Sequence, residues 1–221
     1  MSTPEVRALA AFVDDVLPPD RSHWPPGWPG ETEAALLDAV FSARATYGTP
    51  TSGVRRVIGN WRTHRDTKLD DLTTLAAFAD SPDRIAEILG NRQRVPGNYT
   101  TKAEAAARAA AALVEAGIGG SDRIGDGRTA WEAITAVPGL GAATWETFVL
   151  RLGLVGPRAL DAVHEFVADA LNLGDSATTE TEALDLLGAA ADTAGVDPAA
   201  LLGAVWRYHR TRDRAPKRLS A

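Results

Sequence analysis

The chain has 221 residues, a formal net charge of −6, 45% hydrophobic and 24% charged residues, and no cysteine. This composition excludes a disordered chain and allows one large domain or two small lobes. The missing cysteines exclude disulfides, cysteine nucleophiles, thiolate zinc sites and cysteine-ligated iron–sulfur clusters. No basic segment followed by an apolar core marks a signal peptide, and the alanine-rich run 105–114 is too short to span a bilayer. We therefore expect a cytoplasmic protein.

Apolar residues at helical spacing predict helices along almost the whole chain, and no segment alternates as a strand would. The predicted segments are 4–17, 31–45, 51–64, 71–79, 81–89, 100–117, 129–137, 142–150, 162–172, 179–195 and 197–212. Expected N-caps are Thr51 or Ser52, Ser81 (followed by Pro82), and Thr100 or Thr101. Prolines and glycines interrupt the helices at 18–30, where we expect Trp24 and Trp28 to anchor the loop by burying their rings. The fold class is all-α, with ten or eleven short helices.

Two stretches concentrate basic residues despite the acidic net charge. Each holds a single acid, and their basic residues are Arg55, Arg56, Arg62, Arg65 and Lys68 in the first, and Arg207, Arg210, Arg212, Arg214, Lys217 and Arg218 in the second. Phosphate contacts are local, so such clusters permit an acidic protein to bind nucleic acid. The alternative is a solvated helix face and a solvated tail.

The stretch VPGLGAAT, residues 137–144, is a glycine turn between two predicted helices. Gly139 and Gly141 allow positive φ and a close approach of the backbone to a bulky partner. The N–H groups that begin the second helix have no partner within it, and such an end binds phosphate without lysine. The alternative is an ordinary corner between two helices.

Three motifs, in matching order, carry a resemblance to a known family. VPGLGxxT resembles the hairpin of the helix-hairpin-helix DNA glycosylase superfamily, which includes endonuclease III and the adenine-removing mismatch enzymes. FSARAT, residues 41–46, looks like the Ser-Ala-Gln-Ala-Thr signature of that family. TTKAEAAARAAAALVEAG, residues 100–117, resembles the helix that starts Ser-Lys-Ala and precedes the hairpin. The resemblance covers about residues 30 to 210.

The resemblance implies a two-lobed fold with a central cleft. One lobe would be a helical barrel over residues 34–156 that ends in the hairpin, and the other would join residues 1–33 to residues 157–221. Many relatives hold an iron–sulfur cluster through four cysteines, which this chain lacks. We therefore expect no required cofactor, and a second lobe held by apolar packing around Leu201, Leu202, Val205 and Trp206.

Asp161, twenty-two residues after Gly139, stands where the family has its catalytic aspartate. Breaking a glycosidic bond develops positive charge on the sugar, which a fixed carboxylate stabilises while it orients the attacking water. Asp161 also precedes the predicted helix 162–172, so it suits an N-cap, and the two roles are compatible. Strand-cutting relatives carry a lysine at the position of Ala143. The resemblance therefore implies a monofunctional enzyme that leaves an abasic site.

The resemblance assigns further roles by register. The residues that would contact DNA are Gly139, Leu140, Gly141, Ala142, Ala143, Thr144 and Arg44. Arg44 takes the place of the family's glutamine, which fills the gap left by the flipped base, although it also suits a surface arginine. Aromatic or imidazole rings that would line the base pocket, or simply pack in the core, are Tyr47, Trp145 and His164. Main-chain carbonyls that would hold a structural monovalent cation are those of Thr135, Val137 and Leu140.

The expected function is that of a DNA glycosylase in base excision repair, monomeric and associated with the nucleoid. It would flip a damaged, mispaired or modified base out of double-stranded DNA and hydrolyse its N-glycosidic bond. Uracil, mismatched thymine, alkylated or oxidised purines and bulky phage-type modifications all fit. One alternative is a DNA-binding protein of the same fold without catalysis, and another is a helical interaction module with no nucleic-acid role. No membrane partner is expected.

Overall fold

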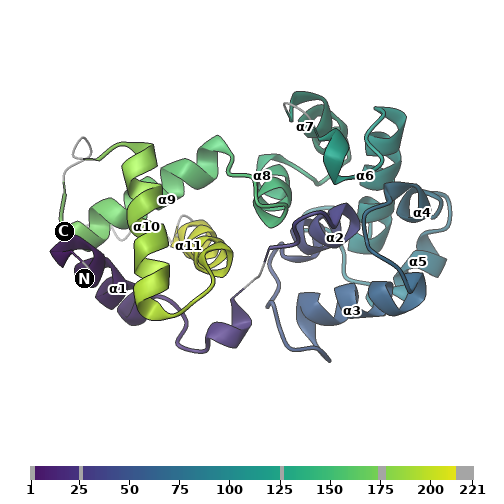
Figure 1. The fold of residues 1–221 in the computed structure, drawn as a ribbon. Helices are drawn as coiled ribbons and strands as arrows, with labels where there is room; N and C mark the ends of the chain where they lie inside the picture. Colours follow the sequence, from purple (N-terminus) through teal and green to yellow (C-terminus); the bar gives the residue numbers. More distant parts are fainter. Residues whose placement is uncertain (1–2, 25–26, 125–126, 174–177, 213–221) are drawn as a thin grey trace, which may run out of the picture. The chain divides into compact units, whose positions relative to one another are not determined.

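The computed structural model describes residues 3–24, 27–124, 127–173 and 178–212, and the structural statements below concern these residues. Their regular structure is eleven α-helices, labelled in Figure 1, and two short 3-10 turns. One isolated β-bridge joins Arg94 to Thr101. The helices are α1 (Pro4–Val16), α2 (Thr32–Phe41), α3 (Gly53–Arg65), α4 (Leu72–Ala76), α5 (Pro82–Ile88), α6 (Lys102–Glu115), α7 (Arg128–Thr135), α8 (Ala142–Arg151), α9 (Pro157–Leu171), α10 (Glu180–Ala194) and α11 (Pro198–Arg212). The all-α prediction is confirmed.

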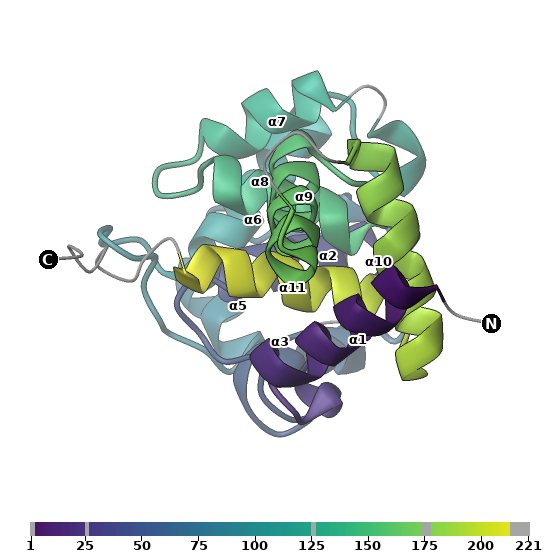
Figure 2. The same cartoon turned by 90° about the vertical axis from the view of Figure 1, so that its left-hand side faces the viewer.

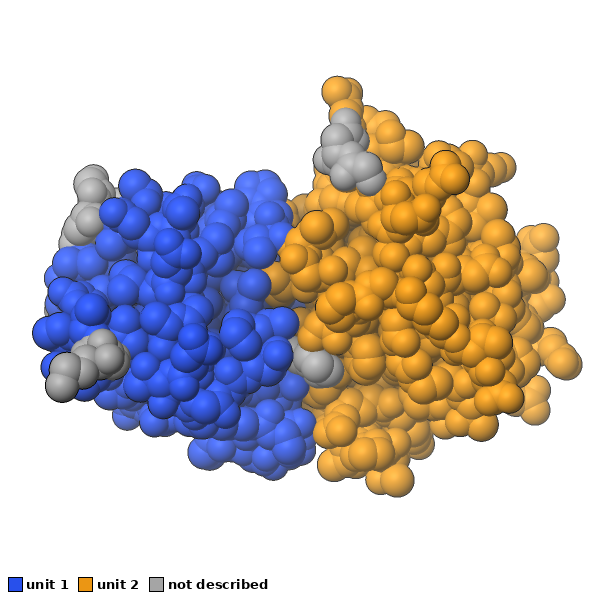
Figure 3. Space-filling view, viewed as in Figure 1, with its two compact units in different colours: residues 1–26, 155–221 blue, residues 27–154 orange. Residues whose placement is uncertain are grey.

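The chain forms two compact units, which Figure 3 distinguishes by colour. Unit 1 joins residues 1–26 to residues 155–221, and unit 2 is residues 27–154. Unit 2 thus begins at Gly27, whereas the sequence placed the first boundary after residue 33. The two tryptophans of the connecting segment explain the earlier start: Trp24 is buried in the core of unit 1, and Trp28 packs against that of unit 2.

Unit 1 is built from α1, α9, α10 and α11, which pack around one apolar core (Figures 1 and 2). Its central residues include Leu201 and Val205, both fully buried, with Leu202 partly buried at the edge. Trp206 is buried as well. Apolar packing therefore holds this unit together, as expected for a chain without cysteines.

Unit 2 is organised around α2, all ten residues of which are buried. The neighbours of this helix are α3, α4, α6 and α8. The helix carries polar residues on several sides, so each of them must find a partner inside the protein.

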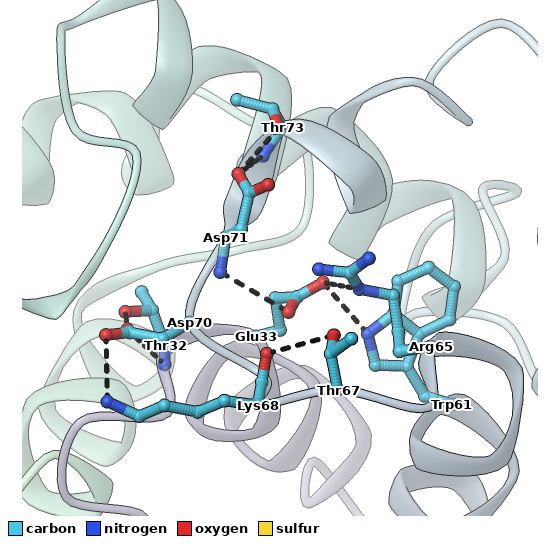
Figure 4. A network of polar contacts seen from close by, with 9 residues as sticks. All are labelled: Thr32, Glu33, Trp61, Arg65, Thr67, Lys68, Asp70, Asp71 and Thr73. Atoms are coloured by element: carbon cyan, nitrogen blue, oxygen red, sulfur yellow. Dashed lines mark hydrogen bonds and ion pairs between the residues drawn. The ribbon is translucent and has the colours of Figure 1, made fainter.

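Glu33 is one of these buried polar residues (Figure 4). Its carboxylate accepts hydrogen bonds from the indole N–H of Trp61 and the Nε–H of Arg65, both at 3.1 Å, and from the Asp71 N–H at 3.4 Å. Burial raises the pKa of Glu33, and the positive charge of Arg65 opposes that rise. This carboxylate therefore ties α2 to α3 and to the start of α4.

Asp38, further along α2, forms the second buried cluster. Its carboxylate lies 3.1 Å from Nε of Arg151 and accepts hydrogen bonds from Trp28 Nε1 at 3.0 Å and Ser42 Oγ at 2.8 Å. Both charged partners are almost completely buried. The cluster joins α2 to the end of α8 and to the first residues of unit 2.

Three of the five basic residues in the stretch 55–68 are paired with acids that lie outside it. The ion pairs are Arg62 with Glu31, Arg65 with Glu33, and Lys68 with Asp70. Asp70 also accepts hydrogen bonds from Thr32 and Ser121, as Figure 4 shows for Thr32. The sequence window, which contains one acid, therefore overstated the local positive charge. In the second stretch Arg212 pairs with Asp169, while Arg214, Lys217 and Arg218 lie outside the described residues.

Several helix ends differ from the sequence expectation. Helix α2 ends at Phe41 rather than at residue 45. Ser52 and Ser81 occupy N-cap positions, but neither side chain caps its helix; the Ser52 hydroxyl accepts the Thr49 N–H instead. Thr101 does cap α6, because its hydroxyl accepts the Glu104 N–H at 3.1 Å.

Candidate nucleic-acid interface

The hairpin, residues 136–141, connects α7 to α8 in unit 2. Its buried Val137 and Leu140 fix it to the core, while Pro138, Gly139 and Gly141 are exposed. Gly141 is the N-cap of α8 in an extended conformation, and its carbonyl accepts the N–H groups of residues 144 and 145. The first N–H groups of α8 have no acceptor within the helix, so they are available to an outside oxygen next to the exposed glycines.

Gly139 is the position in this turn where a side chain would be both strained and crowded. Its φ is +87°, and a Cβ there would lie 2.5 Å from Cγ1 of Val95 and 3.4 Å from Nδ2 of Asn98. The glycine therefore allows the hairpin to lie directly against the 94–101 loop, the segment that precedes α6.

The 94–101 loop is a tight turn closed by main-chain hydrogen bonds. The Val95 N–H donates to the Thr100 carbonyl at 2.9 Å, and the Asn98 side chain accepts the Thr100 N–H at 3.0 Å. At its tip the Tyr99 side chain is 90% exposed, and the Arg94 guanidinium lies 5.7 Å from the centre of its ring. An aromatic ring presented to solvent beside the hairpin is suited to stacking on a base.

Lys102, the first residue of α6, is a buried cation behind this loop. The residue is 2% exposed, and its ammonium donates to the carbonyls of Phe41 at 3.0 Å and Ala43 at 2.8 Å, and to Oε1 of Gln93 at 3.4 Å. Burial lowers its pKa. Lys102 thereby fixes the end of α2 and the segment that carries Arg44.

A family model matches most of the chain. Residues 7–210 match the family described as Domain of unknown function (DUF8548). The chain belongs to the DUF8548 family. No curated protein and no solved structure matches it.

Asp161 of this DUF8548 protein does not cap a helix, contrary to the sequence expectation. Helix α9 begins at Pro157, with Gly156 as its N-cap, so Asp161 lies inside the helix more than one turn from its start. Proline at the first helical position explains the early start, because its fixed φ suits a helix and its missing N–H costs nothing there. The Asp161 side chain is exposed, on unit 1.

The three rings expected in a base pocket occupy different environments. Tyr47 is 3% exposed in the core of unit 2, where burial and the nearby Asp38 raise the pKa of its hydroxyl. Trp145 is partly buried, with its ring 6.0 Å from that of Phe148. His164 belongs to unit 1, and its Nε2 lies 2.9 Å from the carbonyl of residue 178. Their role in a pocket stays a prediction.

Arg44, which the sequence also assigned to DNA, is exposed in the segment after α2, away from the hairpin in sequence. The other sequence-assigned contacts belong to the hairpin and the first turn of α8. Ala142 and Ala143 are partly exposed in the first turn of α8, whereas Thr144 is buried. The Val137 carbonyl, one of the three expected to face a cation, accepts the Leu140 N–H at 3.0 Å. A carbonyl oxygen has a second lone pair, so this bond is compatible with a cation, whose presence stays a prediction. No cluster of three or more metal-binding side chains occurs among the residues described.

Tyr99 and Lys102 are the residues of this interface whose roles sequence reasoning missed. Tyr99 follows the Pro-Gly-Asn turn, and an aromatic residue at the tip of so short a turn was the available signal. The role of Lys102 could not be read from its neighbours in the chain, because the two carbonyls that it holds, at residues 41 and 43, are about sixty residues away. Within the described part of the chain, no helix has the length and apolar character needed to cross a membrane.

Proposed function

We propose that the protein binds double-stranded DNA through the hairpin and the 94–101 loop of unit 2. The supporting observation is the start of α8, where the exposed Gly141 is followed by two partly exposed alanines. These small residues leave the first N–H groups of the helix accessible to a phosphate. Oriented N–H groups and the positive end of a ten-residue helix together attract a phosphate. Tyr99, on the adjoining loop, would stack on a base of the strand so held.

This mode of binding is consistent with an acidic protein. The net charge is −6, and Arg62 and Arg65 are neutralised by ion pairs. Main-chain donors at a helix start do not depend on a basic surface, so the hairpin can bind phosphate where the overall field is unfavourable.

The finer proposal is that the protein is a monofunctional DNA N-glycosylase in which Asp161 stabilises the positively charged sugar. It requires the exposed carboxylate on unit 1 to reach the nucleotide that unit 2 holds. Hydrolysis is favoured over strand cleavage because Ala143 stands where strand-cutting relatives carry a lysine. Lys102 is buried with three acceptors, so its amine is not available for a Schiff base with the sugar.

The second candidate is a DNA-binding protein of the same fold without catalysis. It is favoured by the position of Asp161, which lies inside α9 rather than at its N-cap. The positive end of the helix therefore does less to keep the carboxylate charged than it would at an N-cap, and catalysis needs the charged form. Both candidates share the hairpin and differ only in turnover.

DNA binding is tested first, by fluorescence anisotropy of a labelled duplex at several salt concentrations. We expect Gly139→Ala to weaken binding at least tenfold, because the added methyl group displaces the hairpin from the 94–101 loop. Gly153→Ala is the matched control: its φ of +86° is nearly the same, but a Cβ there meets no atom within 4 Å. Equal binding by both variants would reject the hairpin as the DNA contact.

Catalysis is tested with duplexes that each carry one altered base, followed by alkali to cleave abasic sites. We expect strand breaks only after alkali, and their loss in Asp161→Asn. Asp185→Asn is the control, because Asp185 is also an exposed aspartate on a helix of unit 1. Tight binding with no product from any duplex would favour the non-catalytic candidate, and cleavage without alkali would exclude a monofunctional enzyme.

A further inference from the structure

Unit 2 contains a cleft whose lining residues belong neither to the hairpin nor to the 94–101 loop. Its volume is about 270 Å³, and it lies between the segment after α2, the start of α3 and residues 91–93. Its polar side chains are those of Arg44, Thr46, Arg56, Asn91 and Gln93, so no carboxylate lines it. We call it the arginine cleft.

Arg44 is a charge of the arginine cleft that no acid neutralises among the described residues. Its side chain is exposed, and no hydrogen bond or ion pair involves it in the ranges that the structure describes. Arg62 and Arg65, by contrast, are paired with glutamates. The Arg44 backbone has a φ of +53°, a conformation that L-residues other than asparagine and aspartate rarely adopt. The fold therefore holds an unneutralised guanidinium in a strained position at this cleft.

The other polar groups present donors. Arg56 donates one Nη2–H to the Gly90 carbonyl at 3.0 Å, which orients a guanidinium that has five N–H donors. The Asn91 side-chain oxygen accepts the Gln93 N–H at 2.8 Å, and the Gln93 side-chain oxygen accepts from Lys102 at 3.4 Å. Each amide oxygen already has a partner within the protein, whereas the Asn91 and Gln93 NH₂ groups have none among the described residues and can donate to a ligand.

We propose that the arginine cleft binds a phosphate group. Two guanidiniums and two amide NH₂ groups match the acceptor oxygens of a phosphate, which arginine binds through paired N–H bonds. Gly53 and Val54, at the start of α3, also line the cleft and bring the positive end of that helix to it. The phosphate belongs either to the DNA backbone or to a free ligand such as pyrophosphate, and the site does not depend on the hairpin.

The test measures pyrophosphate binding to the full chain by isothermal titration calorimetry, alongside DNA binding by anisotropy. The test variants are Arg44→Gln and Arg56→Gln. Arg84→Gln is the control, because Arg84 is an exposed arginine of the same unit that does not line the cleft. Arg44→Gly adds a folding control, since glycine tolerates the positive φ and removes the charge.

Pyrophosphate binding that falls at least tenfold in the Arg44 and Arg56 variants, but not in Arg84→Gln, would support a free phosphate ligand even if no DNA bound. Failure of DNA binding in that case would reject only the proposed function. If pyrophosphate does not bind, a smaller salt dependence of DNA affinity in the same variants would support a phosphate of the DNA backbone. Each phosphate that an arginine neutralises adds about 1 to the slope of log affinity against log salt concentration. The proposal is overturned if the Arg44 and Arg56 variants change neither pyrophosphate affinity nor the salt dependence of DNA affinity. It is also overturned if the effect of Arg44→Gln on DNA affinity depends on which base lies opposite the flipped nucleotide, because Arg44 would then contact a base rather than a phosphate.

Discussion

Replacement of Lys102 by methionine tests whether the buried ammonium holds the end of α2 in place. Methionine has a similar length and no donor, so it leaves the carbonyls of Phe41 and Ala43 without their partner. Two hydrogen bonds from a charged donor contribute about 3–6 kcal/mol. Relief of the desolvation cost of the ammonium offsets part of this, and we expect a net loss of about 2–4 kcal/mol.

The pH dependence of Lys102 provides a second signature. Burial lowers its pKa below the ordinary value of 10.5, so between the two values the folded state binds fewer protons than the unfolded state. The free energy of unfolding therefore rises with pH across that interval, and below it this contribution is constant. Lys102→Met removes this pH-dependent gain in the free energy of unfolding. The difference in stability between the wild type and the variant therefore grows as the pH approaches 10.5.

Urea denaturation followed by tryptophan fluorescence and circular dichroism measures both effects, at pH 7 and near pH 10. Lys68→Met is the control, since its side chain is 66% exposed and its pair with Asp70, at 3.6 Å, contributes less than about 1 kcal/mol. If Lys102→Met lost no more stability than Lys68→Met, the buried hydrogen bonds would not be what holds the segment after α2.

Three further changes have outcomes set by the structure. Gly139→Ala is expected to lose about 2–4 kcal/mol in urea denaturation, from positive φ and steric overlap together, and Gly153→Ala only about 1–2 kcal/mol, from φ alone. Asp38→Asn leaves the buried Arg151 charge without its counterion and is expected to lose about 3–5 kcal/mol in a thermal melt. Arg44→Gly relieves the strain at φ +53° and is expected to raise the free energy of unfolding by up to about 1 kcal/mol.

Each of these three predictions has an outcome that would contradict it. Equal losses in the two alanine variants would mean that the 94–101 loop yields to the added methyl group. For Asp38, the double variant with Arg151→Met should recover part of the loss, and strict additivity would show that the two charges do not interact. Destabilisation by Arg44→Gly would mean that the arginine side chain contributes to folding itself.

Local signals predicted much of the helical structure. Apolar spacing located α1, α6 and α10 within a few residues, because each has a continuous apolar face and a threonine N-cap. The turn at Gly139 was also predicted, because a Pro-Gly pair between two helical segments is typical of a turn. The start of α9 was placed too late, although Gly156 followed by Pro157 is itself a helix-start signal.

Long-range pairing is what the sequence did not reveal. The acids that neutralise Arg62 and Arg65 are about thirty residues upstream, so a window along the chain counted the arginines without their partners. The same holds for Asp38, whose arginine partner is on α8. The arginine cleft likewise draws on residues 44, 56, 91 and 93, which no local pattern connects. Such features depend on tertiary packing, which periodicity does not encode.

The discontinuous make-up of unit 1 has a consequence for the order of events during synthesis. Helix α1 packs against α9 and α10, which follow it by well over a hundred residues. At a translation rate of about 5–20 residues per second, α1 waits on the order of ten seconds before its partners leave the ribosome. All of unit 2 is made in that interval and can close its core around α2 first. The apolar face of α1, with Val6, Leu9 and Val13, therefore stays exposed on the nascent chain during that interval, where a chaperone can bind it.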